Sequence, residues 1–261
     1  MLVIRKEQKD VMEAAAAVSF ESELAGHIKD FSPLHADAIG DDAINNAVRL
    51  GIERAKTYGL TKRGPVRFFV EMMVMFGSEF DTDPLLPWAN GVLTNPSIKD
   101  ELERADILHE AMLEYFAEVA GKDKEHLFDS MRRFGKARLE DFHTQGTRFS
   151  DAVMALLKTS YPQRCTYLGD EALQELIESG KEEARSRLIT SAKGGGLLIV
   201  LMFQLGHAAT RDPLFPWISA ALNDESVTDP NERIKNLRAK SVKYLEQSLK
   251  NLGQEKTDGA S

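Results

Sequence analysis

The chain has one cysteine, Cys165, among its 261 residues. An intrachain disulfide needs two cysteines, so that mode of stabilisation is excluded. Cysteine usage this low is typical of a protein in a reducing compartment. We expect Cys165 to be a small buried hydrophobic side chain rather than a nucleophile.

Long apolar runs and basic charge are also scarce. The longest apolar run is 197–203, whereas a helix needs about 20 residues to cross a bilayer. The first ten residues lack the apolar stretch of a secretory signal. Lys and Arg total 33 against 41 Asp and Glu, a net charge of −8, and phosphate contacts need positive charge. The sequence therefore predicts a cytoplasmic protein that binds neither membrane nor nucleic acid.

The chain does contain an internal repeat. At an offset of 129 residues, Asp-Pro-Leu-Leu-Pro-Trp at 83–88 aligns with Asp-Pro-Leu-Phe-Pro-Trp at 212–217. The alignment needs no gap from Phe20 to Tyr115, and it places both tryptophans at equivalent positions. We therefore expect a tandem duplication. The predicted organisation is a first helical repeat at 1–121, a connector and start of the second at 122–141, the second repeat at 142–252, and a disordered tail at 253–261.

Each repeat has the apolar spacing of helices. Phe20, Leu24, Ile28 and Phe31 share one helical face, and Pro33 is expected to end that helix. The segments 65–76 and 197–205 are apolar nearly all round, which is typical of helices at the centre of a bundle. Strand alternation with hairpin turns is missing. The predicted fold is all-α, with two tandem-duplicated repeats packed as one pseudo-twofold helical bundle.

The two Asp-Pro-x-x-Pro-Trp strings are the most specific motifs in the sequence. An aspartate before a proline favours a helix start, because the carboxylate accepts amide hydrogens and proline fits the first turn. We expect the strings to fix rigid elbows between helices, and a place in a recognition surface is the alternative. The structural signature is Asp83, Pro84, Pro87, Trp88, Asp212, Pro213, Pro216 and Trp217.

Candidate metal and cofactor motifs are incomplete. Glu79-x-Asp81-x-Asp83 resembles half of a calcium loop, but it lacks the glycine and the final glutamate. The six histidines contain no pair at i+3 or i+4 spacing, and Lys193-Gly194-Gly195-Gly196 departs from the phosphate-loop pattern. We expect no metal and no cofactor.

Four charged residues are candidate partner contacts. Arg67 and Glu71 lie at i, i+4 spacing on the apolar 65–76 segment. They form either an intrahelical pair or, if buried, a polar contact between the repeats or with a partner. Glu79 and Asp81 complete the set of possible partner contacts.

Several strings of the first repeat resemble a set of small helical proteins encoded in bacterial type VI secretion clusters, beside spike-tip (PAAR) and effector genes. They are Ile4-Arg5-Lys6-Glu7-Gln8, Gly51-Ile52-Glu53-Arg54-Ala55, Tyr58-Gly59-Leu60-Thr61, and the segment 75–88. The second repeat departs from this pattern, with Arg187-Leu188 in place of Tyr58-Gly59. The resemblance implies a neighbourhood of action and no catalytic residues.

Two classes of function remain open. The first is a non-enzymatic adaptor or chaperone that binds a secretion effector or spike component, with an immunity protein against a toxin effector as a variant. Methionines such as Met72, Met73 and Met75 suit adaptable apolar contacts, although a place in the core is the ordinary alternative. The second class is a small helical-bundle hydrolase. Its candidate residues Glu71, Glu79, Asp81 and His109 have Val200, Ala208, Thr210 and Arg238 as counterparts, so only one repeat would be active.

Overall fold

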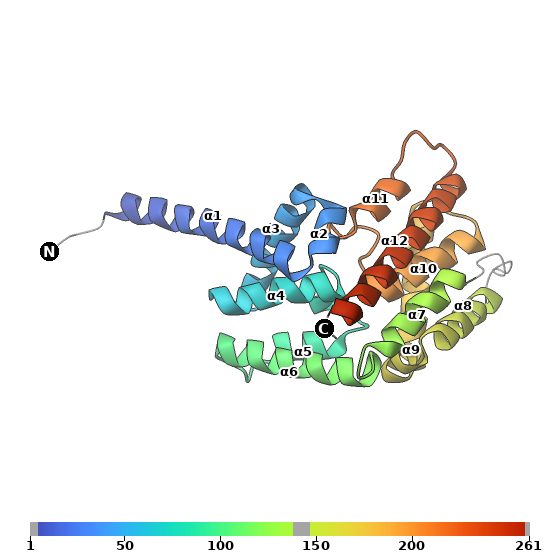
Figure 1. The fold of residues 1–261 in the computed structure, drawn as a ribbon, viewed down its shortest axis with the longest axis horizontal. Coiled ribbons are helices and arrows are strands. Elements are labelled where there is room, and N and C mark those ends of the chain that lie inside the picture. Colours follow the sequence, from blue (N-terminus) through green and yellow to red (C-terminus); the bar gives the residue numbers. More distant parts are fainter. Residues whose placement is uncertain (1–4, 138–146, 259–261) are drawn as a thin grey trace.

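The computed structural model describes residues 5–137 and 147–258, and within these ranges every regular element is a helix. The prediction of an all-α fold is confirmed for this part of the chain. The first half contains α1 (Lys6–Phe31), α2 (Pro33–Ile39), α3 (Asp41–Thr57), α4 (Arg63–Phe76), the short 3-10 helix η1 (Phe80–Thr82), α5 (Pro87–Leu93) and α6 (Glu101–Val119). The second half contains α7 (Glu125–Lys136), α8 (Thr147–Ser160), α9 (Pro162–Ser186), α10 (Ala192–Leu205), α11 (Pro216–Leu222) and α12 (Pro230–Asp258) (Figure 1).

The most apolar helix of each half lies at the centre of that half. α4 packs against α1, α3 and α6, and α10 packs against α8, α9 and α12. Phe69, Met72 and Met73 of α4 are fully buried, and each such side chain stabilises the fold by about 1.5–3 kcal/mol. Met72 and Met73 are therefore core residues, whereas Met75 is only partly buried.

Proline begins helices in this fold rather than merely ending them. α1 stops at Phe31, and Pro33 is the first residue of α2, where its missing amide donor costs nothing. In the second half Pro162 begins α9 in the same way, and α9 changes direction at Gly169, whose φ is 75°. Gly40, 129 residues earlier, has a φ of 81° between α2 and α3.

Other positions 129 residues apart also have nearly the same backbone angles. Gly77 has φ 101° and ψ 154°, and Gly206 has φ 102° and ψ 152°. Leu86, before α5, has φ −129° and ψ 56°, and Phe215, before α11, has φ −127° and ψ 55°. The aligned residues therefore follow the same local path at the turns between helices.

The halves differ most where the sequence suggested a connector. The segment 122–141 contains α7, whose apolar residues Phe128, Met131 and Phe134 are buried against the second half. Their i, i+3, i+6 spacing is typical of a helix. The interpretation of this segment as a connector did not take that spacing into account. α12 continues to Asp258, into the tail expected to be disordered, while 138–146 and 259–261 lie outside the described residues.

α1 is longer than its counterpart. α8 corresponds to residues 18–31 of α1, so the earlier turns of α1 have no equivalent in the second half. Residues 6–19, named here the α1 arm, project beyond the rest of the fold (Figure 1). Every described side chain of the arm is exposed, including Val11 at 69%, Met12 at 62% and Val18 at 68%.

Candidate functional site

The two halves meet most closely where α4 and α10 end. A Cβ atom placed on Gly77 would lie 2.7 Å from the carbonyl oxygen of Leu205, and one on Gly206 would lie 2.8 Å from that of Phe76. Both glycines also have φ and ψ angles that only glycine adopts readily. Two independent constraints, close packing and backbone conformation, therefore require glycine at each position.

The aspartates of the repeated strings hold this junction together. Asp212 Oδ2 accepts a hydrogen bond from the amide of Ser78 at 2.7 Å, and Asp83 Oδ2 accepts one from the amide of His207 at 2.9 Å. The second oxygen of each carboxylate accepts the amide two residues later, Leu214 or Leu85, at 2.8 Å. Each aspartate thus connects its own turn to the opposite half.

This arrangement corrects the predicted helix start at the aspartate. α5 and α11 begin at Pro87 and Pro216, not at Pro84 and Pro213, so the second proline of each string occupies the first turn. The aspartate orders the turn before the helix instead of capping the helix, because its oxygens are committed to Leu85 or Leu214 and to the other half.

The tryptophans of the two strings pack against the last long helix of each half. The Trp88 and Tyr115 ring centroids are 5.6 Å apart, and those of Trp217 and Tyr244 are 5.4 Å apart. All four rings contribute to the apolar core. The strings therefore join three elements: the turn, the short helix that follows it, and α6 or α12.

Charged side chains line the rim of the junction. Arg211 donates two hydrogen bonds to Glu79, at 2.8 and 3.0 Å, and this ion pair connects the halves. His207 lies beside them, with Nε2 at 3.6 Å from Glu79 Oε2. Burial raises the pKa of the Asp212 carboxyl, although the amides of Ser78 and Leu214 oppose that shift. Glu79 is thus engaged within the chain rather than presented to a partner.

Asp81 is also committed inside the chain. It is 1% exposed, accepts hydrogen bonds from Arg54 at 2.7 Å and from the Tyr58 hydroxyl at 2.8 Å, and so belongs to the first half alone. Burial, followed by the bond to Asp81, raises the pKa of Tyr58 to about 12. The expected partner contact at Asp81 is not favoured, because its carboxylate is enclosed and satisfied.

The corresponding trio in the second half has the charges rearranged. Glu183 replaces Arg54, Arg187 replaces Tyr58 and Thr210 replaces Asp81. Arg187 Nε donates to Glu183 Oε1 at 2.7 Å. Each half therefore keeps a pair of opposite charges that includes position 54 or its counterpart 183, with Asp81 as the second member in the first half and Arg187 in the second.

Arg67 and Glu71 do not bridge the halves. Glu71 Oε1 lies 2.6 Å from His27 Nε2 of α1 and 3.7 Å from Arg67 Nε, so the cluster belongs to the first half. The Arg67 side chain is 55% exposed and that of Glu71 is 19% exposed. The alternative of a polar contact between the repeats is wrong for this pair, and a contact with a partner stays a prediction.

The four residues considered for hydrolysis have separate environments. Glu71 is bound to His27, Glu79 to Arg211 and Asp81 to Arg54, while the exposed His109 packs edge-on against Phe68. In the described ranges, no group of three or more His, Cys, Asp or Glu residues is placed to hold a metal ion.

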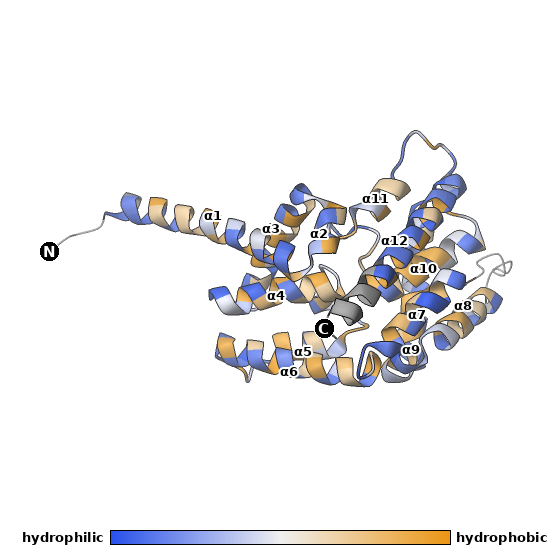
Figure 2. Cartoon of the chain, in the orientation of Figure 1, coloured by the Kyte–Doolittle hydropathy of each residue, from blue (hydrophilic) through white to orange (hydrophobic). Residues whose placement is uncertain are grey.

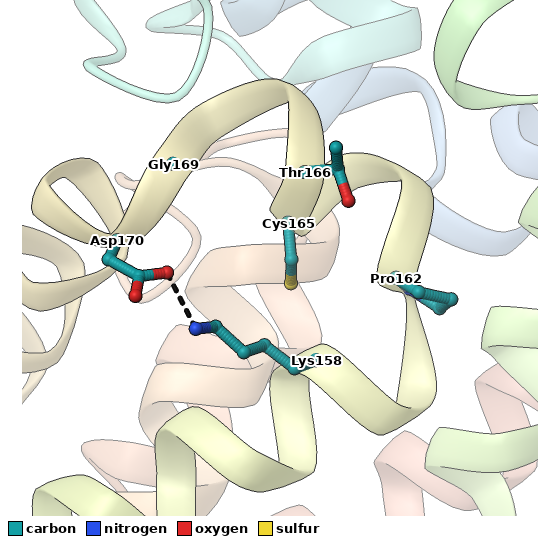
Figure 3. A pocket seen from close by; sticks show the side chains of 6 residues that line it. All are labelled: Lys158, Pro162, Cys165, Thr166, Gly169 and Asp170. Atoms are coloured by element: carbon teal, nitrogen blue, oxygen red, sulfur yellow. Dashed lines mark ion pairs between the residues drawn. The ribbon is translucent and has the colours of Figure 1, made fainter.

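A hollow of 330 Å³ beside Cys165 has a structural explanation. Lys158 and Asp170 line it and form a 2.6 Å ion pair, with Cys165 beside them (Figure 3). Lys29 and Asp41, at the equivalent places in the first half, form the same pair at 2.8 Å, beside an alanine instead of cysteine. Burial raises the pKa of the Cys165 thiol to about 11, which keeps it protonated and unreactive.

The surface formed by α4 and α6 differs sharply from its counterpart. In the second half, Phe134 of α7 closes a small apolar cavity whose lining includes Leu197, Val200 and Gln204 of α10 and Arg238 and Leu245 of α12. The residues at these places in the first half are Phe68, Glu71, Met75, His109 and Phe116. They and the 51% exposed Leu113 form what we name the α4–α6 face.

No described helix of the first half takes the place of α7 on this face. α7 packs against α8 and α12, whereas α1, the counterpart of α8, continues straight into the exposed arm. Phe203 is fully buried beside Phe134, but its counterpart Val74 is only partly buried. Figure 2 shows apolar residues along both α4 and α6. Among the described helices of the first half, none therefore covers the α4–α6 face as α7 covers its counterpart.

The comparisons with known proteins add no relative to this description. No protein-family model matches the chain, no curated protein matches it, and no solved structure matches its fold. Within the described ranges, none of the helices has both the length and the apolar character needed to cross a membrane.

Proposed function

We propose that the chain is a non-enzymatic protein that binds other proteins through the apolar surfaces its own fold leaves open. The observation that supports this most directly is the exposure of the α1 arm, with Val11, Met12 and Val18 all more than 60% exposed, together with the open α4–α6 face. Contiguous apolar surface of this kind is typical of an interaction site.

A tandem duplication explains why one face is open. We propose that an ancestral helical unit was copied, and that the two copies pack about an approximate twofold axis at Gly77 and Gly206. The exchange of hydrogen bonds between Asp83 and His207 and between Ser78 and Asp212 supports this proposal. The same face is then covered by α7 in one copy and accessible in the other.

The partner that we propose is an effector or a spike component of a bacterial type VI secretion system, for which the protein acts as a cytoplasmic adaptor or chaperone. The resemblance of residues 4–93 to proteins encoded beside PAAR and effector genes supports this assignment. An adaptor needs a surface that accepts an amphipathic segment of its client, and the counterpart of the α4–α6 face is covered by one such helix, α7.

An immunity protein is the second candidate. Glu171, Glu175, Glu178 and Glu182 lie along one side of α9 and line a shallow depression of 540 Å³. Together with the net charge of −8, this acidic surface suits a basic toxin such as a nuclease.

Affinity purification of the tagged chain from the organism that encodes it, followed by mass spectrometry, tests the proposal. We expect a stoichiometric effector or spike protein, lost in a Leu113→Asp variant and retained in a Leu188→Asp variant. Leu188 is 75% exposed and lies outside the α4–α6 face, so it is a matched control. Recovery of housekeeping proteins alone contradicts the adaptor. Relief of the captured effector's toxicity on coexpression favours immunity, and loss of its secretion without such relief favours an adaptor.

A further inference from the structure

The α1 arm carries an apolar stripe that its own fold does not use. Val11, Ala15 and Val18 lie on one side of the helix at i, i+4, i+7 spacing. Leu24 and Ile28, which α1 buries in the core, point about a third of a turn away from this stripe. Val11 and Val18 are therefore not a continuation of the helix face that α1 buries in the core. They belong to a separate, exposed side of the helix.

The counterpart of the α4–α6 face in the second half is a surface on which a helix lies. Its counterpart is covered by α7, a helix of 12 residues, and the arm contributes a similar length of helix. α7 presents Phe128, Met131 and Phe134 to the second half, and Arg238 donates a hydrogen bond to the Ala137 carbonyl at the end of α7. In the second half, the surface that corresponds to the α4–α6 face therefore binds a short amphipathic helix, α7.

The arm cannot reach the face of its own molecule. α1 is a single helix from Lys6 to Phe31, and its arm extends away from the bundle (Figure 1). α7 covers its face because it is separate from α8 and packs back against it. Without a break in α1, the arm has to dock on another molecule.

One pair of charges around the two surfaces is complementary. Asp10 lies beside the arm stripe, about 100° around the helix from it, and the α4–α6 face has exposed Arg67 along its α4 side. An arm helix on this face can therefore lie with Asp10 toward Arg67. Lys9 lies on the opposite side of the arm, where it forms an ion pair with Glu13 at 3.4 Å, and takes no part in this contact. Ala14 and Ala15, in or beside the stripe, permit close approach of the two helix backbones.

From these observations we infer that the chain forms a homodimer by arm exchange, in which the α1 arm of each copy lies on the α4–α6 face of the other. The arrangement is isologous, since the same two surfaces pair twice. The inference rests on the proposed role of the α4–α6 face in binding protein helices, and it assigns a second copy as an occupant of that face.

Light scattering coupled to size-exclusion chromatography of the purified full chain, over a dilution series, measures the exchange. We expect a dimer that dissociates on dilution. Two variants, Val11→Asp with Val18→Asp on the arm and Leu113→Asp on the face, are each expected to raise the dissociation constant at least about 30-fold. Leu188→Asp is the control and leaves the dimer unchanged. All these positions are exposed, so circular dichroism should show unchanged folding.

Mixing the arm variant with the face variant identifies which surfaces pair. The arm variant retains an intact face and the face variant an intact arm, so the mixture recovers a heterodimer held by one of the two contacts. A monomer at all concentrations overturns the inference. A dimer that persists in either variant also overturns the inference. So does a mixture of the two variants that stays monomeric at protein concentrations well above the dissociation constant of the unmodified dimer. If the chain is monomeric but Leu113→Asp abolishes capture of an effector, the proposed function stands and the arm exchange fails.

Discussion

The Asp83 carboxylate accepts the backbone amide of His207, 124 residues away in the chain, and so joins the two halves through a charged hydrogen bond. Asp212 makes the reciprocal bond to Ser78. Both carboxylates are 2% exposed, which makes their loss costly because the amides would stay buried without an acceptor.

Asp83→Asn and Asp212→Asn test this connection. Each carboxylate accepts one backbone amide on each of its two oxygens. Asparagine has one oxygen and one NH2 group, so one of the two backbone amides would face another hydrogen-bond donor. We expect each variant to lower the free energy of unfolding by about 1.5–3 kcal/mol in urea titrations. Asp37→Asn, at an exposed site, should change it by less than about 0.5 kcal/mol. Equal stability of all three variants would contradict the role of the junction.

Gly77→Ala should destabilise the protein for two reasons. The new Cβ would lie 2.7 Å from the Leu205 carbonyl oxygen, and alanine tolerates a φ of 101° poorly, at a cost of about 1–3 kcal/mol. Gly26→Ala is the matched control, since open space surrounds that helical site in α1. It should stabilise by about 0.5–1 kcal/mol, and thermal unfolding of the two variants should move in opposite directions.

His35 makes stability depend on pH. Its ring packs edge-on against Phe215 of the other half at 5.6 Å, and burial lowers its pKa below the ordinary 6.5. On acidification, His35 therefore takes up a proton in the unfolded chain at a higher pH than in the folded chain. The contribution of the neutral His35 to the free energy of unfolding is present above pH 6.5 and is lost as the pH falls toward the pKa of the folded state. His35→Leu should reduce the difference in Tm between pH 7.5 and 5.5. An unaltered pH profile in His35→Leu would disprove the prediction.

Cys165 should react slowly in the folded protein. Burial raises the pKa of its thiol to about 11, so little thiolate exists near neutrality, and access is restricted as well. At pH 7.5 we expect alkylation by iodoacetamide to be at least about tenfold slower in the native chain than in urea. Cys165→Ala, which places in the second half the residue found at position 36, should fold normally. Rapid native alkylation would show that the thiol is accessible.

Much of the architecture is predictable because it depends on local patterns. The apolar segments 65–76 and 197–205 indicate central helices, and the structure has α4 and α10 there. The repeat spacing predicts which turns have matching backbone angles. These features need only helical periodicity, proline and glycine.

What escaped prediction depends on contacts distant in sequence. The Asp83 and Asp212 carboxylates bind the opposite half, and no local pattern shows that a buried aspartate caps a turn 124 residues away. α7 was missed because its polar surroundings resemble a connector, although the spacing of Phe128, Met131 and Phe134 was visible. The exposure of the arm follows from the absence of a packing neighbour among the described helices, which composition does not reveal.

Each half carries one tryptophan packed against a tyrosine, Trp88 against Tyr115 and Trp217 against Tyr244. The protein is therefore equipped with two intrinsic fluorophores that report separately on its halves once one is replaced by phenylalanine. If the junction couples the halves fully, the Trp88→Phe and Trp217→Phe chains will lose their emission signal along superimposable melting curves. Two displaced curves would reveal that one half melts ahead of the other.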